Sequence, residues 1–86
     1  MSIVTYASDK SGSLKYSNQD VITRIRKIRK SKKLSMYMLA LNSGLNNTVI
    51  QRVERGEREP KINTLFKIID GLEMSPAEFF KSFREY

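Results

Sequence analysis

A group of polar and cationic side chains lies on the outer side of one predicted short helix, and these residue types can read DNA bases. In this helix, at about residues 47–55, Ile50 and Val53 point inward three residues apart, with Leu45 just ahead of them. In a major groove, Asn and Gln pair with adenine, Arg pairs with guanine, and Thr or Val methyl groups meet the thymine methyl group. Elsewhere in a protein, such residues would more often form a plain polar face. The outer side carries these groups on Asn47, Thr48, Val49, Gln51 and Arg52.

A second predicted helix, at about residues 36–42, precedes this one and connects to it through Gly44. Ala40 is small enough to let the two helices cross closely, and Ile50 returns the second helix to the shared core. Gly44 can adopt a positive φ after the first helix, which a residue with a Cβ does only at a cost. Two helices that cross steeply through such a short turn form a helix-turn-helix.

At these residues the sequence resembles the Cro/repressor-type helix-turn-helix family, also called the XRE family, of phage and bacterial DNA-binding regulators. The resemblance runs from Ile25 to Phe79 and includes Leu39-Ala40, Gly44-Leu45 and Val53-Glu54-Arg55-Gly56. It implies an all-α, five-helix bundle of the lambda-repressor-like DNA-binding type. The implied function is that of a transcriptional regulator, in the form of a repressor, which binds a pseudo-palindromic operator in double-stranded DNA as a homodimer.

The resemblance also implies roles for single residues. By position, the base-reading residues of the family fall on Asn47, Thr48 and Arg52, and Gln51 and Val49 are further candidates on the same helix. Contacts with DNA phosphates are expected at the starts of the two helices and in the loop that follows them. The candidates for these contacts are Ser35, Tyr37, Asn46, Arg55, Arg58 and Lys61.

Met36 departs from the family pattern, which usually has Gln at this position, touching a phosphate or a base edge. Met cannot make that hydrogen bond, so the hydroxyl groups of Ser35 and Tyr37 are the possible substitutes. Tyr37, Met38 and Leu41 also give this helix more apolar surface than a solvent-facing helix needs. We expect the N-terminal arm or a second subunit to cover it, although flexible Met and amphipathic Tyr can also tolerate partial exposure.

The first predicted helix spans about residues 19–32. Asn18 is its expected N-cap, and Asp20 suits the positive end of the helix dipole. Arg29 matches the family arginine that pairs with the glutamate represented here by Glu54. The resemblance therefore implies a structural ion pair between the first and third helices.

The sequence divides into an N-terminal arm and one domain. Residues 1–17 show no helical or strand period and predict a flexible N-terminal arm, whereas residues 18–86 form the DNA-binding domain. A helix is predicted at about residues 62–73, and it packs against both neighbouring helices of the bundle. Ser75 to Glu78 have the capping-box pattern that starts a last helix. Phe79 matches the core position of the family. The candidates for a dimer interface are Phe80, Phe83 and Phe66.

Charge and composition limit the function classes. The chain has 86 residues, enough for one small domain, and 16 Lys and Arg against nine Asp and Glu give a net charge of +7. Residues 20–33 carry seven positive charges and one negative charge, whereas residues 62–86 carry three positive and four negative charges. A localised basic surface favours a polyanion partner, although a solvated basic helix would explain the charge alone.

Catalysis, metal binding and membrane insertion lack candidates in the sequence. The chain contains no Cys and no His, so we expect no metal, no cofactor and no enzymatic activity. The first ten residues lack the basic start and apolar run of a secretory signal, which predicts a cytoplasmic protein. The longest uncharged run, residues 34–51, has Asn, Ser and Gly in its middle and does not predict a membrane span.

Two other functions fit the same residues. One is a protein-interaction module, such as the antitoxin of a toxin-antitoxin pair, with DNA binding secondary and a protein partner on the apolar surfaces. The other is a nucleic-acid binder without sequence preference, driven by the basic first helix.

Overall fold

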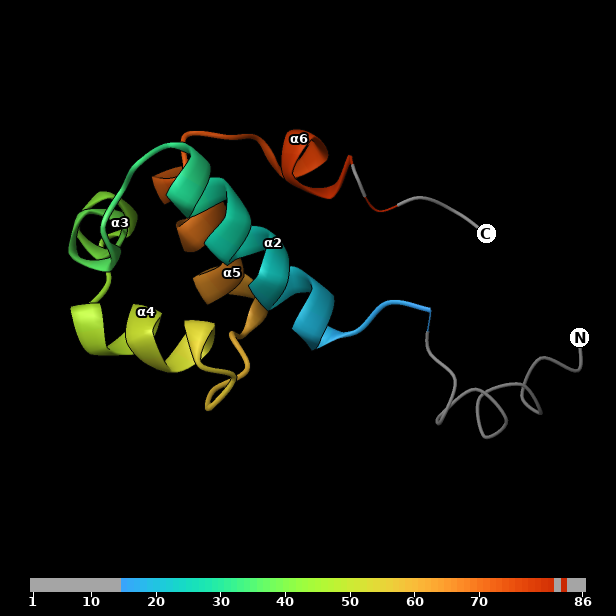
Figure 1. Cartoon of the computed structure of the whole chain (residues 1–86), viewed down its shortest axis with the longest axis horizontal. Coiled ribbons are helices and arrows are strands. Elements are labelled where there is room, and N and C mark those ends of the chain that lie inside the picture. The colour runs from blue at the N-terminus through green and yellow to red at the C-terminus, as the bar shows by residue number, and fades with distance from the viewer. Residues whose placement is uncertain (1–14, 82, 84–86) are drawn as a thin grey trace, which may run out of the picture.

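The computed structural model describes residues 15–81 and Phe83, and this part of the chain is all helical. The predicted five-helix, all-α fold is confirmed, and the four longer helices begin and end within two residues of their predicted bounds. The expected arm at residues 1–17 lies outside the described residues except for its last three. The helices, labelled in Figure 1, are α2 (Asn18–Ser31), α3 (Met36–Ser43), α4 (Asn47–Glu54), α5 (Ile62–Gly71) and α6 (Pro76–Phe80).

The cap of α2 lies one residue earlier than predicted. Ser17 is the N-cap: its hydroxyl oxygen accepts from the backbone N–H of Gln19 at 3.2 Å, and its own N–H donates to Asp20 Oδ2 at 2.8 Å. The prediction that Asn18 caps this helix is wrong, because Ser17 and Asp20 satisfy each other in a capping box and Asn18 becomes the first helical residue.

The predicted capping box at the start of α6 is present. The Ser75 hydroxyl oxygen accepts from the Glu78 N–H at 3.1 Å, and the Ser75 N–H donates to Glu78 Oε1 at 2.9 Å. The backbone hydrogen bond from Ser75 lowers the pKa of Glu78 below its ordinary value of 4.5, and the Ser75 side chain adds to this effect. Pro76 occupies the first turn, where its missing N–H costs nothing.

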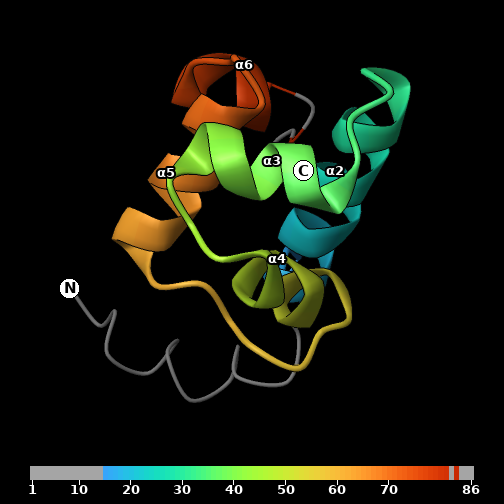
Figure 2. The same cartoon turned by 90° about the vertical axis from the view of Figure 1, so that its left-hand side faces the viewer.

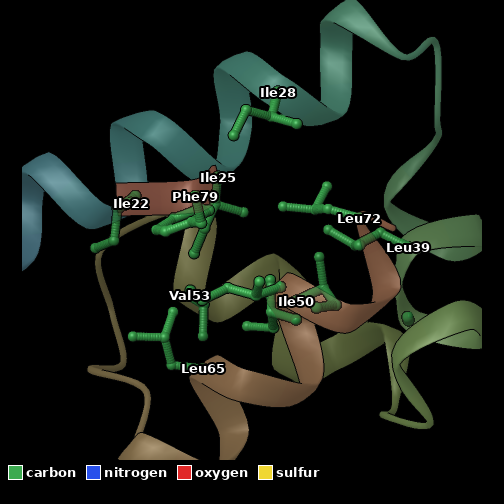
Figure 3. Close-up of a cluster of buried hydrophobic side chains, with 12 residues drawn as sticks. Ile22, Ile25, Ile28, Leu39, Ile50, Val53, Leu65, Leu72 and Phe79 are labelled. Carbon is green, nitrogen blue, oxygen red and sulfur yellow. The ribbon is translucent and has the colours of Figure 1, made fainter. Parts of the chain in front are cut away.

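The hydrophobic core joins all five helices, as Figure 3 shows. The isoleucines of α2 point toward side chains from the other four helices, and Phe79 of α6 is fully buried among them. Each such side chain contributes about 1.5–3 kcal/mol by leaving water. The buried set is Ile22, Ile25, Ile28, Leu39, Ala40, Ile50, Val53, Leu65, Ile68, Ile69, Leu72 and Phe79.

A close helix crossing fixes α3 against α5. Gly71 leaves room for Ser43: a Cβ on Gly71 would lie 2.0 Å from Ser43 Oγ and 3.0 Å from the Ser43 backbone nitrogen. Since backbone atoms cannot turn aside as a side chain can, only glycine allows this approach. Ser43 Oγ is buried without a hydrogen-bond partner, so the crossing depends on packing alone.

The arrangement leaves one side of α4 uncovered by the other helices. In Figure 1, α2 crosses the molecule in front of α5, and α3 and α4 lie together at one end. Figure 2, which looks at that end, shows α4 as the lowest of the helices, below α3 and on the opposite side from α6. The outer face of α4 therefore forms part of the molecular surface.

Candidate nucleic-acid interface

The turn between α3 and α4 has the geometry that its sequence predicts. Gly44 ends α3 with φ 69° and ψ 30°, in the left-handed region that glycine adopts at little cost. The Leu45 N–H then donates to the Ala40 carbonyl at 2.9 Å, which closes the end of α3. Ala40 and Ile50 are both buried where the helices meet. Together α3 and α4 form a helix-turn-helix.

A buried ion pair fixes α4 to α2. Arg29 donates from Nε to Glu54 Oε2 at 2.6 Å and from Nη2 to Glu54 Oε1 at 2.9 Å, while its Nη1 donates to the Leu34 carbonyl at 2.8 Å. Arg26 donates to the backbone carbonyl of Glu54 from the same helix. This is the pair that the resemblance implies, and it gives the outer residues of α4 a rigid base.

The outer face of α4 presents the candidate base-reading residues to different degrees. Thr48 and Arg52 are exposed, and Gln51 is half-buried. Val49 is also half-buried and packs against the core, so only part of its side chain faces outward. Asn47 Oδ1 is buried and has no hydrogen-bond partner, so pairing both amide groups of Asn47 with adenine requires the side chain to rotate. Thr48 and Arg52 are therefore the best-presented candidates.

A family model described as Helix-turn-helix (HTH_3) matches residues 25–79 of this chain. The protein belongs to this family. The match covers the whole of α3, α4 and α5 as well as the Arg29–Glu54 pair.

Solved structures of HTH_3 proteins share both fold and sequence with this chain. One is the restriction-modification controller protein C.Esp1396I, solved as a tetramer in complex with its natural 35 base-pair operator. It is 38% identical to this chain with a TM-score of 0.73, and the match covers 74% of this chain and 84% of that chain. The controller protein C.AhdI from Aeromonas hydrophila is 33% identical with a TM-score of 0.67, over 73% of this chain and 96% of that chain. An HTH_3 family transcriptional regulator from Vibrio cholerae is 36% identical with a TM-score of 0.69, over 74% of this chain and 36% of that chain. A search of curated proteins gives no match. These relatives are thus two controller proteins, one of them solved on operator DNA, and a transcriptional regulator.

The candidate phosphate-binding residues of this HTH_3 protein all lie at the surface. Ser35 is the N-cap of α3, and its hydroxyl oxygen accepts from the Met38 N–H at 3.0 Å, which leaves the hydroxyl hydrogen free for a phosphate. Asn46 occupies the N-cap position of α4, but its side chain makes no capping hydrogen bond, so the amide is also free. The side chains of the exposed cations Arg55, Arg58 and Lys61 make no ion pair or hydrogen bond with the described part of the chain.

The outer face of α3 is apolar and exposed in the described part of the chain. Tyr37 is 62% exposed, Leu41 is 61% exposed and Met38 is 41% exposed. Met36, where the family usually has Gln, is half-buried against the core. The described residues leave this face open. The arm proposed as its cover lies outside the described residues, and cover by a second subunit stays a prediction.

The three dimer-interface candidates lie in different surroundings. Phe66 of α5 is 45% exposed. Phe80 and Phe83 are half-buried and extend the aromatic contacts of Phe79, since the ring centroids of Phe79 and Phe80 are 4.9 Å apart and those of Phe80 and Phe83 are 5.2 Å apart. Phe83 also meets the ring of Tyr16 at 5.2 Å. Phe66 therefore offers the largest free aromatic surface of the three.

Arg24 has a structural role that the sequence reading missed. Its Nε donates to the Phe79 carbonyl at 2.9 Å, and its guanidinium carbon lies 5.8 Å from the centroid of the Phe79 ring. Arg24 therefore ties α2 to α6 and is not a free cation of the basic helix. Nothing in the local sequence separates it from its cationic neighbours, because its partner lies 55 residues away.

Other kinds of site find no support in the described residues. No group of three or more His, Cys, Asp or Glu in residues 15–81 or at Phe83 could hold a metal ion. Within the same part of the chain, every helix is too short or too polar to cross a membrane.

Proposed function

We propose that this protein is a transcriptional regulator that binds double-stranded DNA sequence-specifically, with α4 in the major groove. The outer face of α4 carries this proposal. Thr48 and Arg52 are exposed on a helix whose inner side is held by buried Ile50, Val53 and Glu54. Direct readout of bases needs donors and methyl groups in fixed positions, because a groove distinguishes base pairs by the geometry of their edges.

The same protein acts as a homodimer on a pseudo-palindromic operator. Two copies related by a two-fold axis would place their α4 helices on half-sites about one helical turn, ~34 Å, apart. Phe66, with the free edges of Phe80 and Phe83, is the proposed contact between the copies. By its similarity to C.Esp1396I and C.AhdI, the protein controls genes of a restriction-modification system, and repression is the proposed outcome of operator binding.

Selection of duplexes from a random pool at about 0.15 M salt tests this function, because nonspecific electrostatic binding is weak under these conditions. The expected result is a two-fold symmetric motif. In a reporter strain, the protein should then reduce expression from a promoter that carries this motif and leave a promoter with a scrambled motif unchanged. Recovery of duplexes without a common motif would contradict the proposal.

The exposed apolar face of α3 favours a second candidate, a protein-interaction module with DNA binding secondary. Tyr37 and Leu41 together expose an apolar patch, and such patches on soluble proteins often mark sites of protein interaction. The two functions predict different effects for substitutions on α3 and on α4. Arg52→Ala would remove the activity of a regulator and leave that of an interaction module, whereas Leu41→Ser would remove binding of a protein partner on α3.

A further inference from the structure

A surface hollow of about 420 Å³ lies where the end of α2, the start of α3 and the end of α4 meet. Cationic side chains line most of it, and the half-buried Met36 supplies an apolar wall. The hollow is open to solvent. Its lining residues are Arg26, Arg29, Lys30, Met36, Glu54 and Arg55.

The buried ion pair removes two of these charges from the balance. All three guanidinium nitrogens of Arg29 already donate to Glu54 or Leu34, and Glu54 is only 4% exposed. The pair is neutral as a whole. The hollow therefore takes its net charge from the other three cations.

These three cations are available to a ligand to different degrees. The side chains of Lys30 and Arg55 are exposed, and neither side chain makes a hydrogen bond or ion pair within the described part of the chain. Arg26 is half-buried and donates from Nη2 to the Glu54 carbonyl, while its Nε lies 4.0 Å from Glu54 Oε1. Because Glu54 already pairs with Arg29, a compact anion could also draw on the charge of Arg26. Three positive charges around one hollow, with no free carboxylate among its lining residues, fit a phosphate group.

We infer that Lys30 and Arg55, supported by Arg26, bind one backbone phosphate of the DNA. This assignment rests on the proposed DNA-binding function and adds α2 to the DNA-contacting surface. Arg55 directly follows α4, so a phosphate in the hollow lies beside the end of the helix proposed to enter the groove. Contacts of this kind fix the orientation of a reading helix without distinguishing sequences.

Lys30 has another explanation that must be separated from this one. It lies in the last turn of α2, where a positive charge also stabilises the helix dipole. A dipole role would change the stability of the protein and leave its DNA binding unaltered. A phosphate contact would change the affinity for DNA and the dependence of that affinity on salt.

The test measures DNA binding of Lys30→Gln against salt concentration, on the selected duplex and on a random duplex. Lys67→Gln is the matched control, since it removes the same charge from an exposed helical position that does not line the hollow. Lys30→Gln should bind both duplexes about 5-fold more weakly. The plot of log affinity against log salt should also become less steep, its negative slope losing about 0.9 in magnitude. Lys67→Gln should leave the slope unchanged.

Neutral methylphosphonate groups, placed one at a time in the selected duplex, identify the phosphate. One position per half-site should weaken DNA binding by the wild-type protein and should weaken binding by Lys30→Gln by a smaller factor, because Arg55 and Arg26 still face that phosphate in the variant. Equal slopes for wild type and Lys30→Gln, or an equal fall for Lys67→Gln, would overturn the phosphate site. If Lys30→Gln lowers the slope and the wild-type protein shows no sequence preference, the site stands and the proposed sequence-specific function fails.

Discussion

The two helices of the helix-turn-helix have the same length, but their outer faces differ in chemistry: that of α3 is apolar and that of α4 is polar. Both α3 and α4 span eight residues and bury aliphatic side chains on their inner sides. The outer side of α3 presents Tyr37, Met38 and Leu41, whereas the outer side of α4 presents Thr48 and Arg52. The inner residues thus specify the motif, and the outer residues decide what each helix can bind.

The two helices are also held in different ways. Close packing of Ser43 on Gly71 fixes α3, with no hydrogen bond to Ser43 Oγ. A bidentate ion pair between Arg29 and Glu54 fixes α4. An ion pair sets both distance and orientation, which suits a helix that must align with base edges, while packing of small residues suffices for a supporting helix.

The largest effect should come from breaking the anchor of α4. Glu54→Ala leaves the guanidinium of Arg29 buried without its partner, and stranding a buried charge costs about 3–5 kcal/mol of unfolding free energy. Denaturant unfolding measures this loss. Glu57→Ala, in the exposed loop just after α4, is the control and should change stability by less than about 0.5 kcal/mol. A loss below about 1 kcal/mol for Glu54→Ala would show that the pair does not hold α4.

The anchor of α3 should be the next most sensitive. Gly71→Ala gains up to about 1 kcal/mol in helix propensity, but its Cβ collides with Ser43, and overpacking typically costs about 1–3 kcal/mol. We expect the collision to dominate and the melting temperature to fall. Ser43→Ala removes the buried, unpaired Oγ and serves as the comparison, with a change near zero or slightly stabilising. A more stable Gly71→Ala protein would mean that α3 and α5 can separate freely.

Arg52→Ala tests the outer face of α4 without disturbing its anchor. Arg52 is exposed, so the unfolding free energy should stay within about 0.5 kcal/mol. Binding to the selected operator should weaken by about 1–3 kcal/mol, with preference relaxed at one position per half-site. Competition binding against operators with single substitutions measures both effects. Equal weakening on all sequences would assign Arg52 to a phosphate.

The smallest effect on stability is expected on the outer face of α3. Leu41→Ala should change unfolding free energy by less than about 0.5 kcal/mol, whereas Leu39→Ala, on the buried side of the same helix, should cost about 2–5 kcal/mol. Sedimentation then tests the predicted cover. If a second subunit packs on α3, Leu41→Ala weakens self-association, and unchanged self-association would exclude that interface.

The sequence predicts most strongly where a residue type has a single local use. Gly44 at a left-handed turn and Ser75 with Glu78 at the start of α6 follow from short-range geometry, and both are present in the structure. Ser17 and Asp20 make a capping box of the same kind, which the sequence reading overlooked in favour of Asn18. The Arg29–Glu54 pair spans 25 residues and was expected only through resemblance to a family, because no local pattern joins the two residues.

The sequence alone determined the helix-turn-helix, because apolar spacing, one glycine and the capping residues act through neighbours along the chain. Only the tertiary structure decided which cations are free. Among Arg24, Arg26, Arg29 and Lys30, all on α2, the first three contact α4 or α6, and Lys30 faces the hollow beside Arg55. The physical reason is that a charge acquires its role from the groups around it in space, and those groups lie far away in sequence.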